Sequence, residues 1–313
     1  MTETGTECFP QPVFLEFYFD NSSIKSMTIK IKYKSPKRDM SKSGLEPIYR
    51  VVATDQAGRE QKVAIAGESP LTILVDDTEI VTLMTLGTHP EELVLGYLRN
   101  QGLIEDIEDI VQVKVDWESE RANVVTNSRK GLKYIKEKLS KRIVTSGCGQ
   151  GTLFSCSLDK LYEIKLSNFQ LRQSTIYALL KELTKYNQIY KEVGSVHGCG
   201  LCQNSKVLIF IEDVGRHNAA DAIGGRMWID GITGADKVLY TTGRLTSEIV
   251  MKAAQMTIPV VLSRSGMTRM GLELAQDLGI TLIARAKGRR FFVYHGQENI
   301  VFDAPPKNPA SDP

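Results

Sequence analysis

The chain has 313 residues, of which 42% are hydrophobic and 24% are charged, a composition typical of a soluble globular protein with one large domain or two ordinary ones. The formal net charge of +2 is too small to make a nucleic acid an expected partner. The chain has no apolar run of about 18 residues, and its first residues lack the basic and apolar regions of a secretory signal, so we expect a cytoplasmic protein without a membrane span.

Residues 1–45 are predicted to form a basic N-terminal extension that is partly disordered. Seven basic residues and a single acid, Asp39, lie between Lys25 and Lys42. Two interpretations stay open, an arm for RNA or another anionic partner and a solvated tail, and the composition favours the tail. At the other end, residues 304–313 are rich in proline and are predicted to be a disordered tail.

Residues 46–166 are predicted to form a smaller N-terminal α+β domain, which begins with short β-rich runs. A helix follows in which Thr88 is the expected N-cap and Pro90 occupies the first turn. A second helix is expected at residues 132–142, directly before the loop that contains Cys148.

Residues 167–303 show the pattern of an α/β domain. After an amphipathic helix expected at residues 175–190, short strands rich in Val, Ile and Leu alternate with helices. Such alternation predicts a mostly parallel sheet covered by helices on both faces. The expected strands are 207–211, 237–241, 259–263, 280–284 and 290–294, and the expected helices are 218–229, 247–256 and 268–278.

The first candidate reactive group is Cys148, which lies in the run Ser146-Gly147-Cys148-Gly149. Glycine neighbours leave a thiol accessible, and the six basic residues from Lys130 to Arg142 are expected to lower its pKa. The resulting thiolate is the form of cysteine that attacks and carries sulfur. The alternative is an ordinary exposed thiol beside a solvated helix, and the local sequence supports both interpretations equally.

A second candidate is the glycine-rich run from His197 to Cys202, in which Cys199 and Cys202 have Cys-x-x-Cys spacing. This spacing suits a redox pair, a shared sulfane sulfur or half of a tetrahedral zinc site, and His197 is placed as a third ligand or a base. The alternative is a chance cluster of small residues in a tight turn. Of the other cysteines, Cys156 has the apolar neighbours of a core residue and Cys8 falls in the N-terminal extension.

Two further clusters follow predicted strands, where parallel sheets place their ligand sites. The first is expected to line a pocket, with His217 as a candidate for proton transfer. Its other members are Glu212, Asp213, Gly215, Arg216, Asn218 and Asp221. The second gathers four cations around one glycine and can hold phosphates, unless it is a solvated hairpin tip. It consists of Arg285, Ala286, Lys287, Gly288, Arg289 and Arg290.

Together these segments resemble the FdhD family of formate dehydrogenase accessory sulfurtransferases. The resemblance runs in unbroken order over residues 46–302 and includes the segments 88–98, 102–104, 145–149 and 281–283. Its strongest part is the run Glu212-Asp213-Val214-Gly215-Arg216-His217-Asn218-Ala219-Ala220-Asp221.

The resemblance implies both a fold and a function. It implies a cytidine-deaminase-like core without that family's zinc chemistry. It also implies a sulfur carrier that accepts a persulfide from a cysteine desulfurase and passes the sulfur to the molybdenum cofactor, in its bis-guanine-dinucleotide form, for formate dehydrogenase. Cys148 matches the persulfide cysteine, and residues 285–290 match the cofactor-binding turn. No resident metal or permanent cofactor is expected, and a homodimer is the candidate oligomeric state.

One departure from the family concerns the second cysteine. The family's Cys-Gly-x-Cys is Cys148-Gly149-Gln150-Gly151 here, whereas Cys199 and Cys202 are additional. Either the partner thiol has moved to the second loop, or a metal site has been gained, or Cys148 acts alone. We expect Cys148 to lie near the 199–202 loop, across a pocket that exposes His217.

Two other functions remain as alternatives. One is a zinc- or iron-binding regulatory or structural protein that uses Cys148, Cys199 and Cys202 with a histidine. The other, zinc-dependent deamination, fits less well because that chemistry needs His-x-Glu and the chain has His197-Gly198-Cys199.

Overall fold

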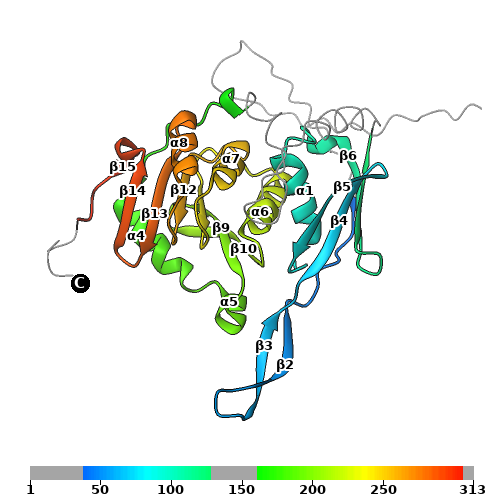
Figure 1. Cartoon of the computed structure of the whole chain (residues 1–313). Coiled ribbons are helices and arrows are strands. Elements are labelled where there is room, and N and C mark those ends of the chain that lie inside the picture. The colour runs from blue at the N-terminus through cyan, green and yellow to red at the C-terminus, as the bar shows by residue number, and fades with distance from the viewer. Residues whose placement is uncertain (1–37, 128–160, 306–313) are drawn as a thin grey trace, which may run out of the picture. The chain divides into compact units, whose positions relative to one another are not determined.

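The computed structural model describes residues 38–127 and 161–305 (Figure 1). From Asp39 onward the described residues belong to one compact unit. No helix in these two ranges is long and apolar enough to cross a membrane.

The first sheet has five strands in the order β1-β6-β7-β4-β5. Along β4 and β5 alternate residues are buried, which is the period-two pattern of strands with one face on a core. The bounds are β1 Asp39–Met40, β4 Ser69–Val75, β5 Thr78–Thr85, β6 Ile110–Asp116 and β7 Arg121–Thr126. A separate two-stranded hairpin lies between β1 and β4 in the chain. It is formed by β2 Ile48–Thr54 and β3 Glu60–Ala66.

Helix α1, Pro90–Asn100, follows β5 and begins one residue later than expected. The N-cap is His89, with no side-chain hydrogen bond to the helix, so the prediction of Thr88 as the cap is wrong. Pro90 does occupy the first turn, where its missing N–H has no helical partner to lose. A short 3₁₀ turn, Ile107–Asp109, then leads into β6.

The second sheet has six strands in the order β10-β9-β11-β12-β13-β14. Only the pairs β11–β12 and β12–β13 are parallel, while β9 is antiparallel to both of its neighbours and β14 is antiparallel to β13. The sheet is therefore mixed, and the prediction of a mostly parallel sheet is not confirmed. The bounds are β9 His197–Gln203, β10 Lys206–Asp213, β11 Val238–Thr241, β12 Val260–Ser263, β13 Thr281–Lys287 and β14 Arg290–His295.

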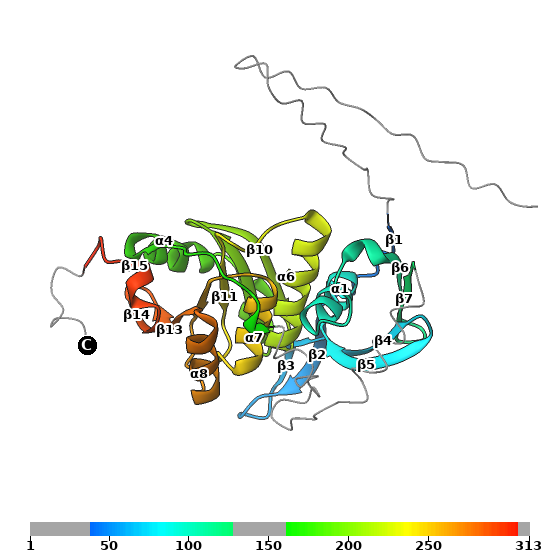
Figure 2. The same ribbon diagram turned by 90° about the horizontal axis from the view of Figure 1, so that it is seen from above.

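Helices cover both faces of this sheet, as expected (Figure 2). One face packs on α6 Arg216–Asp230, α7 Ser247–Gln255 and α8 Arg269–Leu278. The other packs on α4, Gln173–Leu183, beside the short parallel pair of β8 Leu171–Arg172 and β15 Ile300–Val301. The helix expected at 175–190 is broken, because Asn187 adopts a left-handed conformation, with φ of 61°, before α5, Gln188–Val193.

Two helices join the first sheet to the second. The backbones of α1 and α6 touch at Gly96 and Gly225, where an added Cβ would lie 1.6 Å from the Asp221 carbonyl oxygen and 1.9 Å from that of Glu92. One continuous cluster of buried side chains runs from β4 and β5 through these helices to the second sheet. It crosses the predicted domain boundary between residues 166 and 167, and the division into two domains stays a prediction.

The prediction of an accessible loop from His197 to Cys202 is wrong. This run is the buried strand β9, paired on both sides. The glycines are needed because the Phe210 ring packs across them. An added Cβ at Gly198 would lie 2.6 Å from that ring, and one at Gly200 would lie 3.3 Å from it.

Candidate functional site

The candidate site lies at one edge of the six-stranded sheet. Strands β10, β11, β12 and β13 all point the same way, so their carboxyl ends share this edge, and β9 begins there at His197. Helices α6, α7 and α8 each start just after one of these strands. Their N-terminal N–H groups therefore face the edge, which is where α/β sheets bind ligands.

An arginine lies just after or near the carboxyl end of each of the four strands at this edge. Arg216 comes after β10, Arg244 after β11, Arg264 after β12, and Arg285 lies in β13 at a bulge, with φ of 52°. Arg216 is buried and its side chain lies over Gly243, where an added Cβ would be 2.4 Å from its Cδ. The other three are exposed. We call Arg216, Arg244, Arg264 and Arg285 the arginine row.

Two members of the arginine row were missed by the sequence analysis. Arg244 and Arg264 each stand within three residues of a strand that was predicted correctly, in Thr242-Gly243-Arg244 and in Ser263-Arg264-Ser265. Both lie just after a strand, and ligand sites of α/β sheets lie at strand ends, so this position is the signal that indicates them.

His197 borders the arginine row. It is half-buried, and its Nδ1 lies 3.4 Å from the hydroxyl of Thr242. Burial lowers the pKa of His197, and the positive charges of Arg216 and Arg244 lower it further. His197 is therefore neutral at physiological pH and can donate or accept a hydrogen bond at this edge.

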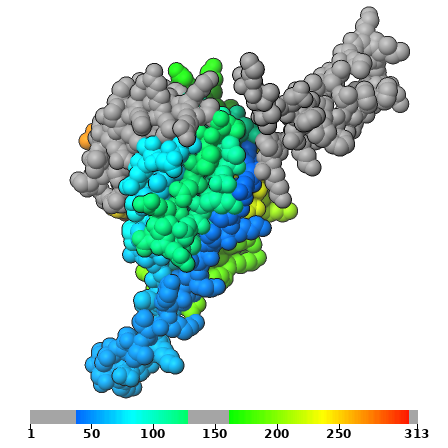
Figure 3. Space-filling view, turned by 90° about the vertical axis from the view of Figure 1, so that its right-hand side faces the viewer, coloured from blue at the N-terminus to red at the C-terminus, as the bar shows by residue number. Residues whose placement is uncertain are grey.

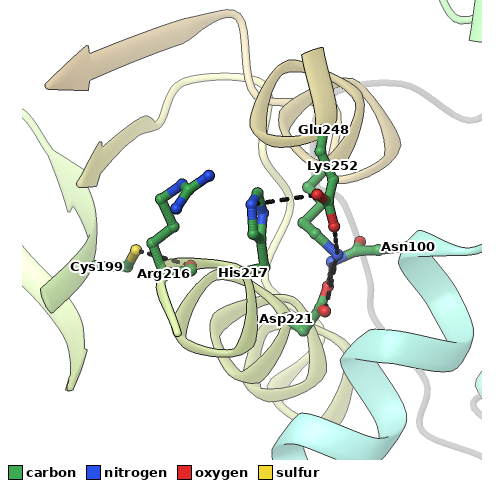
Figure 4. Close-up of polar contacts among 7 residues, drawn as sticks. All are labelled: Asn100, Cys199, Arg216, His217, Asp221, Glu248 and Lys252. Carbon is green, nitrogen blue, oxygen red and sulfur yellow. Dashed lines mark hydrogen bonds and ion pairs between the residues drawn. The ribbon is translucent and has the colours of Figure 1, made fainter. Parts of the chain in front are cut away.

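His217 is not exposed in a pocket, and that prediction is wrong. The side chain is buried in the first turn of α6, and its Nε2 lies 3.2 Å from Oε2 of Glu248 in α7 (Figure 4). Burial lowers the pKa of His217 to about 2, helped by the charges of Lys252 and Arg216. Burial likewise raises the pKa of Glu248. A neutral, enclosed imidazole is a poor exchanger of protons with bulk solvent.

Asp221 belongs to the core contact between helices. Its two carboxylate oxygens lie 2.7 and 2.8 Å from Nζ of Lys252, and the amide of Asn100 donates a hydrogen bond of 2.8 Å to the same carboxylate (Figure 4). Both charged side chains are inaccessible, with 0% of Asp221 and 2% of Lys252 exposed. Asp221 therefore ties α6 to α1 and α7 and does not line a pocket.

Asp213, before α6, and Asn218, in its first turn, are also structural. Asp213 accepts hydrogen bonds from the hydroxyl of Thr85, at 2.6 Å, and from the backbone N–H of Leu86 and of Gly215, both at 3.0 Å. Asn218 donates to Asp213 and to the carbonyl oxygen of Met84. These contacts fix the end of β5 to the turn that carries Arg216.

Glu212 has a different structural role, at the start of α5. Its carboxylate accepts the backbone N–H groups of Ile189, at 3.1 Å, and of Tyr190, at 2.8 Å. Both groups lie in the first turn of α5, where they have no partner within the helix. Of the predicted pocket residues, only Arg216 faces the candidate site.

Cys199 and Cys202 cannot act together. Their side chains point to opposite faces of the sheet, since Cys199 packs in the cluster with α6 and Cys202 in the cluster with α4. Cys199 donates to the hydroxyl of Thr241, at 3.3 Å. Burial raises the pKa of both thiols to about 12, so neither is a thiolate at physiological pH. The two thiols therefore share no disulfide and no metal ion.

The remaining cysteines, Cys8, Cys148 and Cys156, lie outside the described residues. The expectation that Cys148 lies near residues 199–202 therefore stays a prediction. Across residues 38–127 and 161–305, no group of three or more His, Cys, Asp or Glu side chains is arranged to hold a metal ion.

The basic turn joins β13 to β14, as predicted. Lys287 pairs with Arg290 across it, and Gly288 adopts a left-handed conformation, with φ of 62°. Arg289 lies 5.0 Å above the ring of Tyr177 in α4, a cation–π contact that holds this side chain. Ala286 is buried under the turn, whereas Arg285 and Lys287 are exposed.

The fold and the candidate site define an α/β protein with a cationic ligand edge at the carboxyl ends of its strands. Comparison with known proteins then identifies the family. The model of the FdhD/NarQ family matches residues 66–301, and the chain belongs to this family.

Relatives and a solved structure agree with this assignment. The chain is 34% identical over 251 residues to the sulfur carrier protein FdhD of Listeria innocua, covering 79% of this chain and 95% of the relative. It is 32% identical over 235 residues to the protein of that name from Bacillus subtilis, covering 74% and 88%. A crystal structure of a putative formate dehydrogenase accessory protein from Desulfotalea psychrophila superposes with a TM-score of 0.64 at 28% identity, covering 81% and 98%.

Proposed function

We propose that this chain is a sulfur carrier that accepts sulfur as a persulfide on Cys148 from a cysteine desulfurase in the cytoplasm. It passes this sulfur to the molybdenum cofactor, in its bis-guanine-dinucleotide form, that formate dehydrogenase needs. Membership of the FdhD/NarQ family and the names of the relatives support the sulfur-carrier role. The likeness to a formate dehydrogenase accessory protein supports the link to that enzyme.

The observation that carries this proposal is the arginine row. A bis-dinucleotide bears several phosphates, and guanidinium groups bind phosphate oxygens through paired, charge-assisted hydrogen bonds. The N-termini of α6, α7 and α8 add partial positive charge at the same edge. The edge and the basic turn together therefore offer a long cationic surface for the phosphates of the cofactor, which here is a substrate.

We further propose that Cys148 carries the sulfur without Cys199 or Cys202. Both of those thiols are 0% exposed and protonated, so a persulfide on Cys148 has no second thiolate to meet in β9. The same burial argues against the metal-binding alternative built on these two cysteines.

The sulfur step is tested by intact mass after incubation with a cysteine desulfurase and cysteine. The wild-type chain should gain the mass of sulfur, and a reductant should remove it. Cys148→Ala should gain none, whereas the matched control Cys202→Ala should gain as much as the wild type. Equal sulfur uptake by Cys148→Ala would show that the carrier cysteine lies elsewhere.

The binding step is tested by calorimetry with GDP as the probe. A charge-assisted hydrogen bond contributes about 1.5–3 kcal/mol, so Arg264→Ala and Arg285→Ala should each weaken GDP binding at least about tenfold. The matched control is Arg59→Ala, which removes an exposed arginine between β2 and β3, outside the arginine row. Sulfur uptake should be unchanged in all three variants. GDP affinity that is the same in all three would move the ligand site away from the arginine row.

A further inference from the structure

Strand β14 carries an exposed aromatic ring beside the arginine row. Phe292 is 59% exposed, although phenylalanine is usually buried. Its register partner in β13 is Ala284, the residue directly before Arg285. Because neighbouring strands lie about 4.8 Å apart, the Cα atoms of Phe292 and Arg285 are separated by roughly 6 Å. The ring therefore lies next to the last member of the arginine row.

Arg285 is tied to the preceding member of the row. Its backbone N–H donates a hydrogen bond of 2.8 Å to the carbonyl oxygen of Ser265, the residue after Arg264. The bulge at Arg285 is thereby fixed to the loop that follows β12. Among the described residues, neither Arg264 nor Arg285 forms an ion pair with a carboxylate. Two guanidinium groups that can take an anionic ligand and one exposed ring thus lie together.

Exposure alone does not mark a ring that binds a ligand. Tyr49 is 53% exposed on the β2–β3 hairpin, which protrudes in the space-filling view (Figure 3). Phe302, directly after β15, is 58% exposed. The arginine nearest to each of these rings along the chain or across the strand pair already has a carboxylate partner. The two pairs are Arg50 with Glu192 and Arg172 with Asp303. Phe292 differs from both rings because its neighbours in the arginine row can still bind an anion.

A second aromatic side chain holds the ring of Phe292 in place. Tyr294 stands two residues later, so it points to the same face of the strand, and it packs against the buried cluster on the side of α8. The two ring centroids are 6.2 Å apart and the ring planes are inclined by 55°. Such a tilted contact supports the Phe292 ring and leaves one of its faces open. A ring that is already oriented loses little entropy when a ligand stacks on it.

We propose that Phe292 stacks on the guanine base of the cofactor whose phosphates the arginine row binds. This inference rests on the proposed function and adds the residue that positions the base. In a nucleotide one ribose separates the flat base from the phosphates, which matches a ring that lies next to the guanidinium groups. Base–aromatic stacking is a strong contact, and every base has a π-face that can take part in it. Phe292 therefore contributes affinity and position, and it does not select guanine over adenine.

Calorimetry of the full chain with GDP, with ADP and with pyrophosphate, which has no base, tests the stacking. Phe292→Ala should weaken GDP binding at least about fivefold, because it removes the ring on which the base stacks. The affinity for ADP should fall by the same factor, and the affinity for pyrophosphate should not change. The matched control is Phe302→Ala, which removes an equally exposed phenylalanine and should leave the affinity for all three ligands as it is.

The comparison of ligands separates this inference from the proposed function. Equal GDP affinity in Phe292→Ala and the wild type would overturn the stacking while the arginine row keeps its role. An equal loss for GDP and pyrophosphate would also overturn it, because the substitution would then act on the basic turn and not on the base. A wild type that binds neither ligand would overturn the proposed function, and this inference with it. Arg264→Ala should weaken the binding of both ligands whether or not Phe292 stacks.

Phe292→Trp gives a direct readout of the contact. The indole has a larger face than the phenyl ring, so this variant should bind GDP at least as tightly as the wild type. Stacking on a purine quenches indole fluorescence, so GDP should lower the emission of Phe292→Trp by more than it lowers that of the wild type. Pyrophosphate should not produce this extra quenching. Emission that responds equally to GDP and to pyrophosphate would overturn the stacking.

Discussion

The ion pair between Lys252 and Asp221 gives the sharpest stability prediction. The ammonium contacts both carboxylate oxygens, at 2.7 and 2.8 Å, deep between α1, α6 and α7. In Lys252→Met the hydrocarbon stem is largely kept while the charge is lost. The Asp221 carboxylate, 0% exposed, would keep only the hydrogen bond from Asn100.

The expected cost follows from leaving a buried charge without its partner. Removing one member of a buried ion pair costs about 3–5 kcal/mol of the free energy of unfolding. For a chain of this size each kcal/mol lowers the Tm by about 2–4 °C, so we expect a fall of roughly 6–20 °C. The double variant Lys252→Met, Asp221→Leu removes both charges and should recover most of the loss, because apolar pairs of similar volume are well tolerated at such sites.

Chemical denaturation of the wild type, both single variants and the double variant measures this effect. Without the ammonium, burial raises the folded pKa of Asp221 further above its unfolded value. The folded Lys252→Met chain then binds more protons, so its deficit should grow as the pH rises from about 4 and level off above the raised pKa. A loss below about 1 kcal/mol in Lys252→Met, with no recovery in the double variant, would refute the reasoning.

Three further predictions concern single groups. Gly96→Ala should lower the unfolding free energy by more than about 2 kcal/mol, measured by denaturation, because its Cβ would meet the Asp221 carbonyl oxygen at 1.6 Å; an unchanged stability would mean that α1 and α6 separate easily. Cys199 should resist alkylation in the native chain and react only after unfolding, as mass mapping would show, because it is buried and its pKa is raised to about 12. His217 has a pKa of about 2 when folded, so between pH 6.5 and pH 5 the unfolded state gains a proton that the folded state does not. The stability of the wild type relative to His217→Gln should then fall by up to about 1.4 kcal/mol per pH unit as the pH drops, and a constant difference would show that His217 titrates normally.

The helices and parallel strands of the second sheet could be predicted because their signals are local. The Thr268 hydroxyl caps α8, accepting the Gly271 N–H, and the apolar period of α7 matches its buried face. Strand β9 could not be predicted, since its two glycines disfavour strands and its stability comes from pairing with β10 and β11. The Phe210 ring packs over the two glycines of β9. The same ring contacts Tyr186, with 4.9 Å between the ring centroids.

The candidate site shows the same division between local and distant signals. The arginine row follows strand ends and is visible in the sequence, although Arg244 and Arg264 were overlooked. The burial of His217 is not visible, because its partner Glu248 stands 31 residues later on another helix. A polar run after a strand indicates either a ligand site or a set of internal contacts, and only the positions of the distant partners decide between them.

The motif at residues 212–221 therefore acts mainly by holding the candidate site in place. Asp213 ties the turn before α6 to β5, and Asp221 ties α6 itself to α1 and α7. The first turn of α6 is therefore held by contacts on both sides of it. Arg216 extends from this rigid turn over Gly243, next to His197. Rigid placement matters because a guanidinium that is already oriented loses less entropy when it binds a phosphate. In the proposed function, Asp213 and Asp221 would thus contribute to phosphate binding through Arg216, which they position.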